Sequence, residues 1–226
     1  MEQYKIIQNT KNKKKLGNDF EAKDVWLSKV GNKRLIKFKV HILAYNDYRI
    51  LEFPNNNENG KELTILNDQD VSGKFNEIRI PPNMKYVNLG RIKGLERILI
   101  DKKNENIYIK DNMILSKPKK HMKILLLVMN NMRNGVCIPN DVRRINDHCF
   151  HLLHYLQYIY IPRSVTEISS NAFKGLIDVR YIFYQNGTLP DVIDQIVRIT
   201  KNIKVDKYVK IDGYKDIDLY LEKDLI

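Results

Sequence analysis

Three histidines recur at every third residue of the segment DHCFHLLHY, at His148, His151 and His154. On a tight 3₁₀ turn this spacing would stack the imidazoles on one side, where they could ligate a transition metal. The apolar neighbours Cys149 and Phe150 are expected in the core, which leaves the histidines at outward positions. No further ligand of a closed metal site is apparent. We therefore favour solvated histidines, with metal binding as the alternative, and expect no cofactor.

Two lysine clusters, in NTKNKKKLGND and SKPKKHMK, could bind phosphates. The formal net charge of +12, from 39 Lys+Arg and 27 Asp+Glu, favours acidic partners such as nucleic acid, an anionic membrane or an acidic protein. No aromatic residues interleave with the lysines, so a solvated surface is the ordinary interpretation. Binding of a polyanion, strongly dependent on salt, is the alternative function. Its candidate residues are Lys11, Lys13, Lys14, Lys15, Lys117, Lys119, Lys120 and Lys123.

Motifs of catalysis are absent from the sequence. The Gly-Lys pairs in NGKEL and SGKFN lack the earlier glycine and the following Ser/Thr of a phosphate loop, and G-x-S-x-G, H-E-x-x-H and paired C-x-x-C motifs do not occur. We therefore expect a protein that is not an enzyme. Two cysteines cannot build a disulfide framework, and no apolar run reaches the about 18 residues of a membrane span. The start MEQYKIIQNTKNKKK lacks the apolar core of a signal peptide, so we expect a cytoplasmic protein, with non-classical export or the cell surface as alternatives.

An internal repeat of 23 residues is the strongest pattern in the chain. A fixed period in this range is typical of a solenoid, in which each unit buries its apolar face against the next. Leu156, Ile159 and Ile161 form an L-x-x-I-x-I strand, which Pro162 ends because it has no N–H to donate. The paired positions are Ile138 with Ile161, Pro139 with Pro162, Val142 with Val165, Ile145 with Ile168, Cys149 with Ala172, Phe150 with Phe173, and Leu156 with Val179.

The repeat unit IPRSVTEISSNAFKGLIDVRYI resembles the leucine-rich repeat of the BspA-like type. Upstream, FNEIRIPPNMKYV repeats the strand and the Ile80-Pro81 step, and residues 95–139 are similar to the hairpin-bearing insert of such proteins. The resemblance covers roughly Lys74 to Thr188. It implies an α/β, right-handed leucine-rich repeat solenoid with short parallel strands, short helical turns, an inserted β-hairpin and a C-terminal helical cap. BspA-like repeats occur in surface and adhesion proteins, which implies contact with a host or a cell surface.

Four parts of the chain follow from this interpretation. Residues 1–20 are expected to be a basic tail, residues 21–70 a β-rich N-terminal cap, residues 71–188 the solenoid and residues 189–226 the C-terminal cap. Strands are expected in RLIKFKVHILAY and YRILEFP. In the C-terminal cap, Pro190 begins an amphipathic helix with Val192 and Ile196 on one face, and YKDIDLYLEKDL predicts a second, shorter helix.

The side chains at the x positions of the strands should point outward along the concave face, because the apolar positions between them enter the core. Tyrosine and arginine, the types that dominate interface hot spots, are frequent there. We therefore predict a protein-protein interaction module that binds another protein through this face. Partial cover of the aromatic residues by the C-terminal helix is an equally weighted alternative. Cys137 is expected on this face as a free thiol. The candidate partner-binding residues are Arg79, Arg97, Gln157, Tyr158, Tyr160, Arg180, Tyr181 and Phe183.

Overall fold

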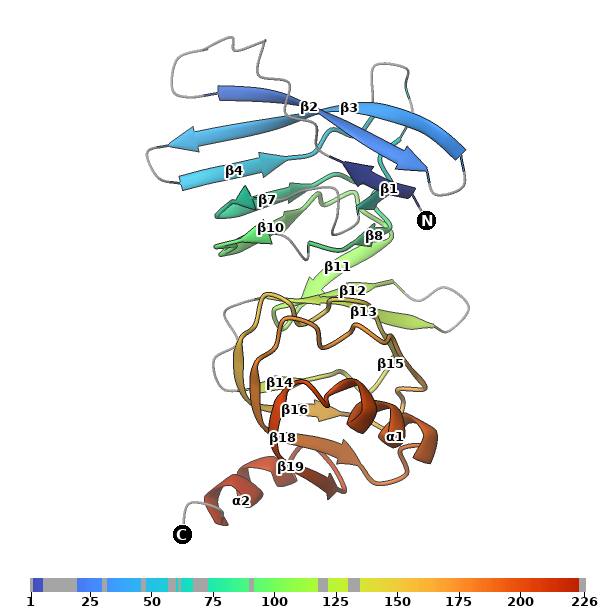
Figure 1. The fold of residues 1–226 in the computed structure, drawn as a ribbon, viewed down its shortest axis with the longest axis vertical. Helices are drawn as coiled ribbons and strands as arrows, with labels where there is room; N and C mark the ends of the chain where they lie inside the picture. The colour runs from blue at the N-terminus through green and yellow to red at the C-terminus, as the bar shows by residue number, and fades with distance from the viewer. Residues whose placement is uncertain are drawn as a thin grey trace. The chain divides into compact units, whose positions relative to one another are not determined.

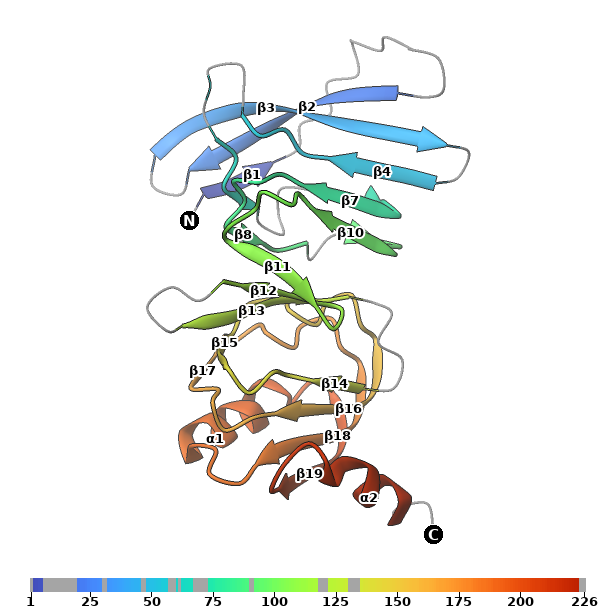
Figure 2. The same ribbon diagram turned by 180° about the vertical axis from the view of Figure 1, so that it is seen from behind.

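The computed structural model describes residues 2–5, 20–29, 32–45, 48–56, 60, 62–66, 73–89, 92–117, 122–129 and 135–223 (Figures 1 and 2). The chain forms two compact units, Met1–Lys117 and Pro118–Ile226. The fold is a β-solenoid, and its described residues contain only two helices. The expected α/β class is corrected in this respect, because the segments between strands are mostly turns too short for a helix. The predicted division into tail, two caps and solenoid stays a prediction.

The larger sheet of the first unit has six strands in the order β1-β2-β3-β4-β7-β10. Strands β1 (Glu2–Lys5), β2 (Phe20–Lys29), β3 (Asn32–Tyr45) and β4 (Tyr48–Glu52) pair antiparallel. Strands β7 (Glu77–Ile80) and β10 (Arg97–Ile100) continue the sheet in parallel with β4. Two short parallel pairs, β5 (Ile65–Leu66) with β8 (Tyr86–Val87) and β6 (Gly73–Lys74) with β9 (Ile92–Lys93), belong to the same unit.

A ladder of apolar residues holds the parallel strands β4, β7 and β10 of the first unit together. Leu51, Ile78 and Ile98 share one register position and are all buried. Their neighbours along each strand point to the opposite side of the sheet, because side chains alternate along a strand. The period-2 pattern therefore fixes which side chains face outward.

The hairpin expected between residues 95 and 139 is present. Strands β11 (Ile107–Lys110) and β12 (Met113–Ser116) pair antiparallel. The two residues between them, Asp111 and Asn112, have φ values of 47° and 58°, as in a type I′ turn. Asp and Asn tolerate this left-handed conformation better than most residues, so the sequence of the turn favours the hairpin.

The second unit carries two sets of parallel strands. One contains β13 (Lys123–Val128), β15 (Val142–Ile145) and β17 (Glu167–Ile168). The other contains β14 (Gly135–Cys137), β16 (Tyr155–Ile161), β18 (Asp178–Gln185) and β19 (Lys204–Ile211), in that order. The predicted repeat register is confirmed, because Ile145 pairs with Ile168 and Leu156 with Val179.

The apolar repeat positions form the core of the second unit. Phe150 and Phe173 are fully buried and stack with ring centroids 5.0 Å apart. Cys149 replaces alanine in the core, as predicted, and its Sγ donates to the Leu125 carbonyl at 3.0 Å. The expected helical turns are single hydrogen-bonded turns, such as the one closed by the Ala172 N–H and the Ser169 carbonyl.

Neighbouring repeats of the second unit approach each other closely at a glycine. Gly175 has a φ of +108°, and a Cβ placed on it would lie 2.7 Å from the Cα of His151. Only a residue without a side chain fits this approach, because the backbone of the preceding repeat occupies the space.

The C-terminal segment contains both expected helices. Helix α1 (Pro190–Ile199) begins with Pro190 and buries Val192 and Ile196. The chain then adds β19 to the parallel sheet, within the range predicted to be a cap, before helix α2 (Asp216–Lys223). Among the residues with a described structure, no helix is long and apolar enough to cross a membrane.

Candidate functional site

The outward side chains of β4, β7 and β10 form two rows beside the buried ladder. One row contains Glu52, Arg79 and Leu99, which share a register position. The other contains Glu77 and Arg97 next to the buried Ile50. The structure therefore brings the predicted residues Arg79 and Arg97 together on one face of the first unit.

A network of ion pairs fixes these arginines. Arg79 donates through Nε to Glu77 Oε1 at 2.8 Å and through Nη1 to Glu52 Oε2 at 3.2 Å, and Arg97 Nη1 lies 3.7 Å from Glu77 Oε2. The hydrogen bond to Glu77 raises the pKa of Arg79 above its usual value, with partial burial opposing it. The Glu77 side chain is 5% exposed, whereas that of Arg97 is 63% exposed. The buried carboxylate thus holds two guanidinium groups at the surface in defined positions.

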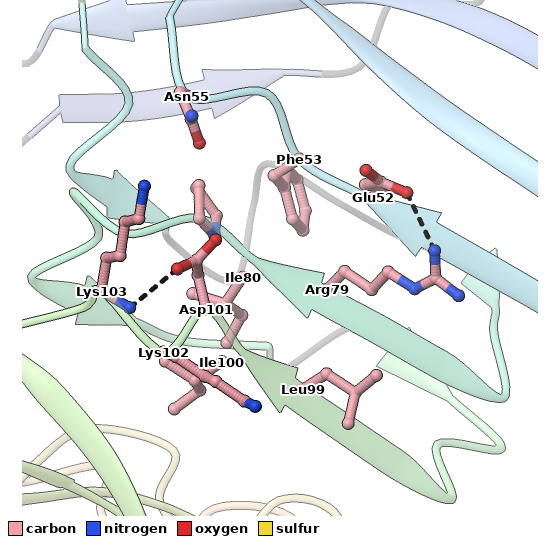
Figure 3. Close-up of a pocket in the computed structure, with 11 residues that line it drawn as sticks. Glu52, Phe53, Asn55, Arg79, Ile80, Leu99, Ile100, Asp101, Lys102 and Lys103 are labelled. Carbon is pink, nitrogen blue, oxygen red and sulfur yellow. Dashed lines mark hydrogen bonds and ion pairs between the residues drawn. The ribbon is translucent and has the colours of Figure 1, made fainter.

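A cleft of about 540 Å³ opens at the carboxyl ends of the same three strands (Figure 3). We call it the strand-end cleft. Its apolar part consists of Phe53, Ile80, Pro81, Leu99 and Ile100. Its polar part consists of Glu52, Asn55, Arg79, Asp101, Lys102 and Lys103.

The turn after β10 positions the two lysines of the strand-end cleft. Asp101 Oδ1 accepts a hydrogen bond from the Lys103 backbone N–H at 2.8 Å, which closes a local turn (Figure 3). Lys102 and Lys103 are both exposed. An apolar floor with charged groups of both signs at its rim is suited to binding a side chain or short segment of another molecule.

In the second unit, helix α2 covers the corresponding outward side chains. Tyr160, Tyr181 and Phe183 pack against Ile217, with Tyr158, Tyr220 and Leu221 at the edge of the group, which we call the aromatic cluster. The Tyr220 ring stands edge-on to Tyr181 and Phe183, with centroids 5.7 and 5.4 Å away. The predicted alternative, in which the C-terminal helix covers these residues, describes the observed packing.

The predicted exposure of three candidate residues is therefore corrected. Tyr160, Tyr181 and Phe183 are at most 1% exposed, because the apolar face of α2 packs on them. Tyr158 and Gln157 are half-buried. The sixth candidate of this unit, Arg180, is exposed, and its guanidinium carbon lies 5.1 Å from the centroid of the Tyr181 ring. A role of these residues in partner binding stays a prediction.

Cys137 lies half-buried beneath Tyr158. The Tyr158 ring crosses β14 above Gly135, where a Cβ would come within 2.5 Å of the ring. The Cys137 thiol points to the Tyr158 hydroxyl at 4.0 Å. Burial raises the pKa of the Cys137 thiol, and burial together with Cys137 raises the pKa of Tyr158 to about 12. Both groups are therefore protonated at neutral pH, so Cys137 is a weak nucleophile there.

Only two of the eight predicted polyanion-binding lysines lie in the described residues. Lys117 Nζ donates to the Asn104 carbonyl at 3.0 Å, and Lys123 Nζ pairs with the Asp141 carboxylate. The other six, Lys11, Lys13, Lys14, Lys15, Lys119 and Lys120, lie outside the described residues.

The three histidines are spread over a turn of the second unit. His148 and His151 are half-buried and His154 is exposed. His151 Nδ1 is 2.6 Å from the His148 carbonyl oxygen. Within the described ranges, no group of three or more His, Cys, Asp or Glu is arranged to hold a metal ion.

The comparison with known protein families agrees with the repeat architecture. Residues 129–197 match the family described as "BspA type Leucine rich repeat region (6 copies)". The resemblance to BspA-type leucine-rich repeats is thus confirmed for these residues. The match covers the 23-residue repeats of the second unit, and the resemblance predicted upstream of residue 129 stays a prediction. No curated protein sequence matches the chain.

Two solved structures are similar to this chain at low identity. A leucine rich cell surface protein from Faecalibacterium prausnitzii is 14% identical, with a TM-score of 0.37, over 75% of this chain and 61% of that chain. The pneumococcal vaccine antigen PcpA is 12% identical, with a TM-score of 0.31, over 67% of this chain and 49% of that chain. The chain thus spans less than two thirds of either protein structure.

Part of the strand-end cleft was not predicted from the sequence. Glu52 and Phe53 lie in YRILEFP, which was predicted as a strand without a register to the strands that follow it. An alignment of LEFP at residues 51–54 with IRIP at residues 78–81 would have placed Glu52 beside Arg79. No comparable signal indicated Lys102 and Lys103, which follow β10 in an irregular turn.

Proposed function

We propose that the protein is a non-enzymatic interaction module that binds a partner protein through the concave face of its solenoid. We propose further that the contact centres on the first unit, at Arg97, Leu99 and the strand-end cleft. One observation carries this choice: these outward side chains are accessible beside an apolar cleft, whereas helix α2 covers the aromatic cluster of the second unit.

The chemistry of the strand-end cleft supports recognition of a protein surface. An apolar side chain of the partner would fill the floor at Phe53 and Leu99, where removal of apolar surface from water stabilises the complex. The charged rim would orient the partner. Arg79 needs little further ordering for this role, because Glu52 and Glu77 already hold its guanidinium.

A photo-crosslinking amino acid at position 99 tests the proposal in native cells. We expect a defined protein adduct from position 99 and none from position 174, where Lys174 is exposed in the second unit. The reversal Lys102→Glu in the crosslinking protein should reduce the yield of the adduct. A protein adduct from position 174 alone would contradict the proposed location.

Polyanion binding gives a different result in the same system. Nucleic acid captured through the basic segments would be released by nuclease and by moderate salt, since phosphate contacts depend steeply on ionic strength. Recovery of such material without a protein adduct would refute the proposed function. The cytoplasmic location and its cell-surface alternative both stay predictions.

A further inference from the structure

Strand β19 forms one edge of the second unit's larger sheet. It pairs with β18 from Lys204 to Ile211, and the described residues place no strand on its other side. Figures 1 and 2 both show β19 as the last strand of this sheet. An edge strand of eight residues presents a row of backbone N–H and C=O groups to which another extended segment can pair.

The side chains of β19 differ from those of the strand beside it. Tyr181, Ile182 and Phe183 of β18 are buried, whereas their register partners on β19 include the exposed Lys207 and Tyr208. The Tyr208 hydroxyl lies 2.7 Å from Thr200 Oγ1, within hydrogen-bond distance, and the side chain is 39% exposed. The edge therefore offers an oriented aromatic surface together with positive charge.

Charge decides which kind of strand can join this edge. Residues 201–210 contain Lys201, Lys204, Lys207 and Lys210, with Asp206 as their one acidic residue. A second copy related by two-fold symmetry would pair antiparallel, and in the register centred on Lys207 it would bring Lys204 opposite Lys210, where like charges repel. An acidic segment would instead meet the lysines Lys204, Lys207 and Lys210, of which Lys204 also pairs with Asp178 and Asp206.

We propose that β19 accepts an extended acidic segment of a partner as an additional strand. Hydrogen bonds between the two main chains would supply affinity, and the lysines would select acidic side chains. This edge is separate from the strand-end cleft of the first unit, so the proposal goes beyond the function proposed above and does not depend on it.

Fluorescence anisotropy of labelled peptides with the full-length chain tests the proposal. The probe is a peptide as long as β19 with alternating Glu and Thr, and its matched control has Lys in place of Glu. We expect saturable binding of the acidic peptide and none of the basic peptide. The double variant Lys204→Glu/Lys210→Glu should weaken binding about tenfold, as expected for two exposed charge pairs. The control Arg163→Glu/Lys174→Glu makes the same change of net charge at exposed positions away from β19 and should have little effect.

N-methylated peptides distinguish strand pairing from attraction between charges alone. Methylation of every second amide blocks one edge of the peptide, and methylation of the alternate set blocks the other. A peptide strand paired on β19 uses one edge, so one methylated peptide should lose binding and the other should retain it. Equal binding of both peptides, equal weakening by the two double variants, or no binding of the acidic peptide would overturn the proposal. The proposal would also fail if sedimentation showed that the chain self-associates and that the Lys204→Glu/Lys210→Glu variant changes this self-association.

Discussion

Replacing Asn104 by leucine should destabilise the first unit strongly. The Asn104 side chain is 4% exposed and takes part in four hydrogen bonds. Its Nδ2 donates to the carbonyls of Pro81 and Met84, each at 3.0 Å. Its Oδ1 accepts from the backbone N–H groups of Asn106 and Ile107, at 2.8 and 2.9 Å. Asn104 thus joins the turn after β7 to the start of the β11–β12 hairpin.

The size of the effect follows from these four bonds. A hydrogen bond within a protein contributes about 0.5–1.5 kcal/mol net, so the substitution should lower the free energy of unfolding by about 2–6 kcal/mol. Leucine has the same number and branching of side-chain heavy atoms as asparagine, so the substitution leaves no cavity and the loss comes mainly from backbone groups left without partners. Domains are stable by only about 5–15 kcal/mol, which makes the expected loss easy to measure.

Guanidinium unfolding of the full chain provides the measurement. Far-UV circular dichroism reports on both units, and fluorescence of Trp26, the one tryptophan of the chain, reports on the first unit, since β2 contains it. The matched control is Asn140→Leu, at an exposed asparagine of the second unit, which should leave the midpoint nearly unchanged. A loss of less than about 1 kcal/mol in the Asn104→Leu variant, with an unchanged denaturant slope, would refute the reasoning.

Three further predictions concern the second unit. Tyr160→Phe removes a buried hydroxyl that has no hydrogen-bond partner in the described part of the chain, so thermal unfolding should show equal or higher stability, and a clear loss would contradict this. Gly175→Ala should lower the free energy of unfolding by about 1–3 kcal/mol because of the left-handed backbone, and by more because of the clash with His151. The control Gly60→Ala measures the backbone contribution alone, because Gly60 has a φ of +74° and open space around its Cβ. Stability should fall as the pH rises from about 9 to about 12, because Cys137 and Tyr158 have raised pKa values and the unfolded chain therefore loses these protons first. The variant Cys137→Ser/Tyr158→Phe should make this part of the stability profile, measured by denaturant unfolding, less steep; a slope remains because burial also raises the pKa values of Cys149 and Tyr160.

The core of the second unit could be predicted from the sequence because its repeat is regular. Each apolar position recurs after the same number of residues, so a single alignment assigned Phe150 and Phe173 to the same layer of the core. The structure stacks these two rings. The start of helix α1 was equally predictable, because Pro190 fits the first position of a helix and Val192 begins its apolar face.

The packing of helix α2 on the aromatic cluster was less predictable from the sequence. Ile217, Tyr220 and Leu221 have the spacing of one face of a helix within YKDIDLYLEKDL, but an amphipathic pattern does not say which surface that face contacts. The strand-end cleft was hidden for a different reason. The spacing between β4, β7 and β10 is unequal, so no single period aligned Glu52 with Arg79 or indicated the bonding partners of Asn104.

The length of chain between contacting residues has a consequence for folding kinetics. Hydrogen bonds between neighbouring repeats join residues that are nearly one repeat apart, as in Ser164 to Val142, 22 residues away, and Asn104 to Pro81, 23 residues away. Each new repeat therefore closes a loop of similar and moderate length, and the entropy cost of closure does not grow as the solenoid lengthens. Folding that starts in one repeat can then spread to its neighbours, so the rate should depend on the first repeat formed more than on the total number.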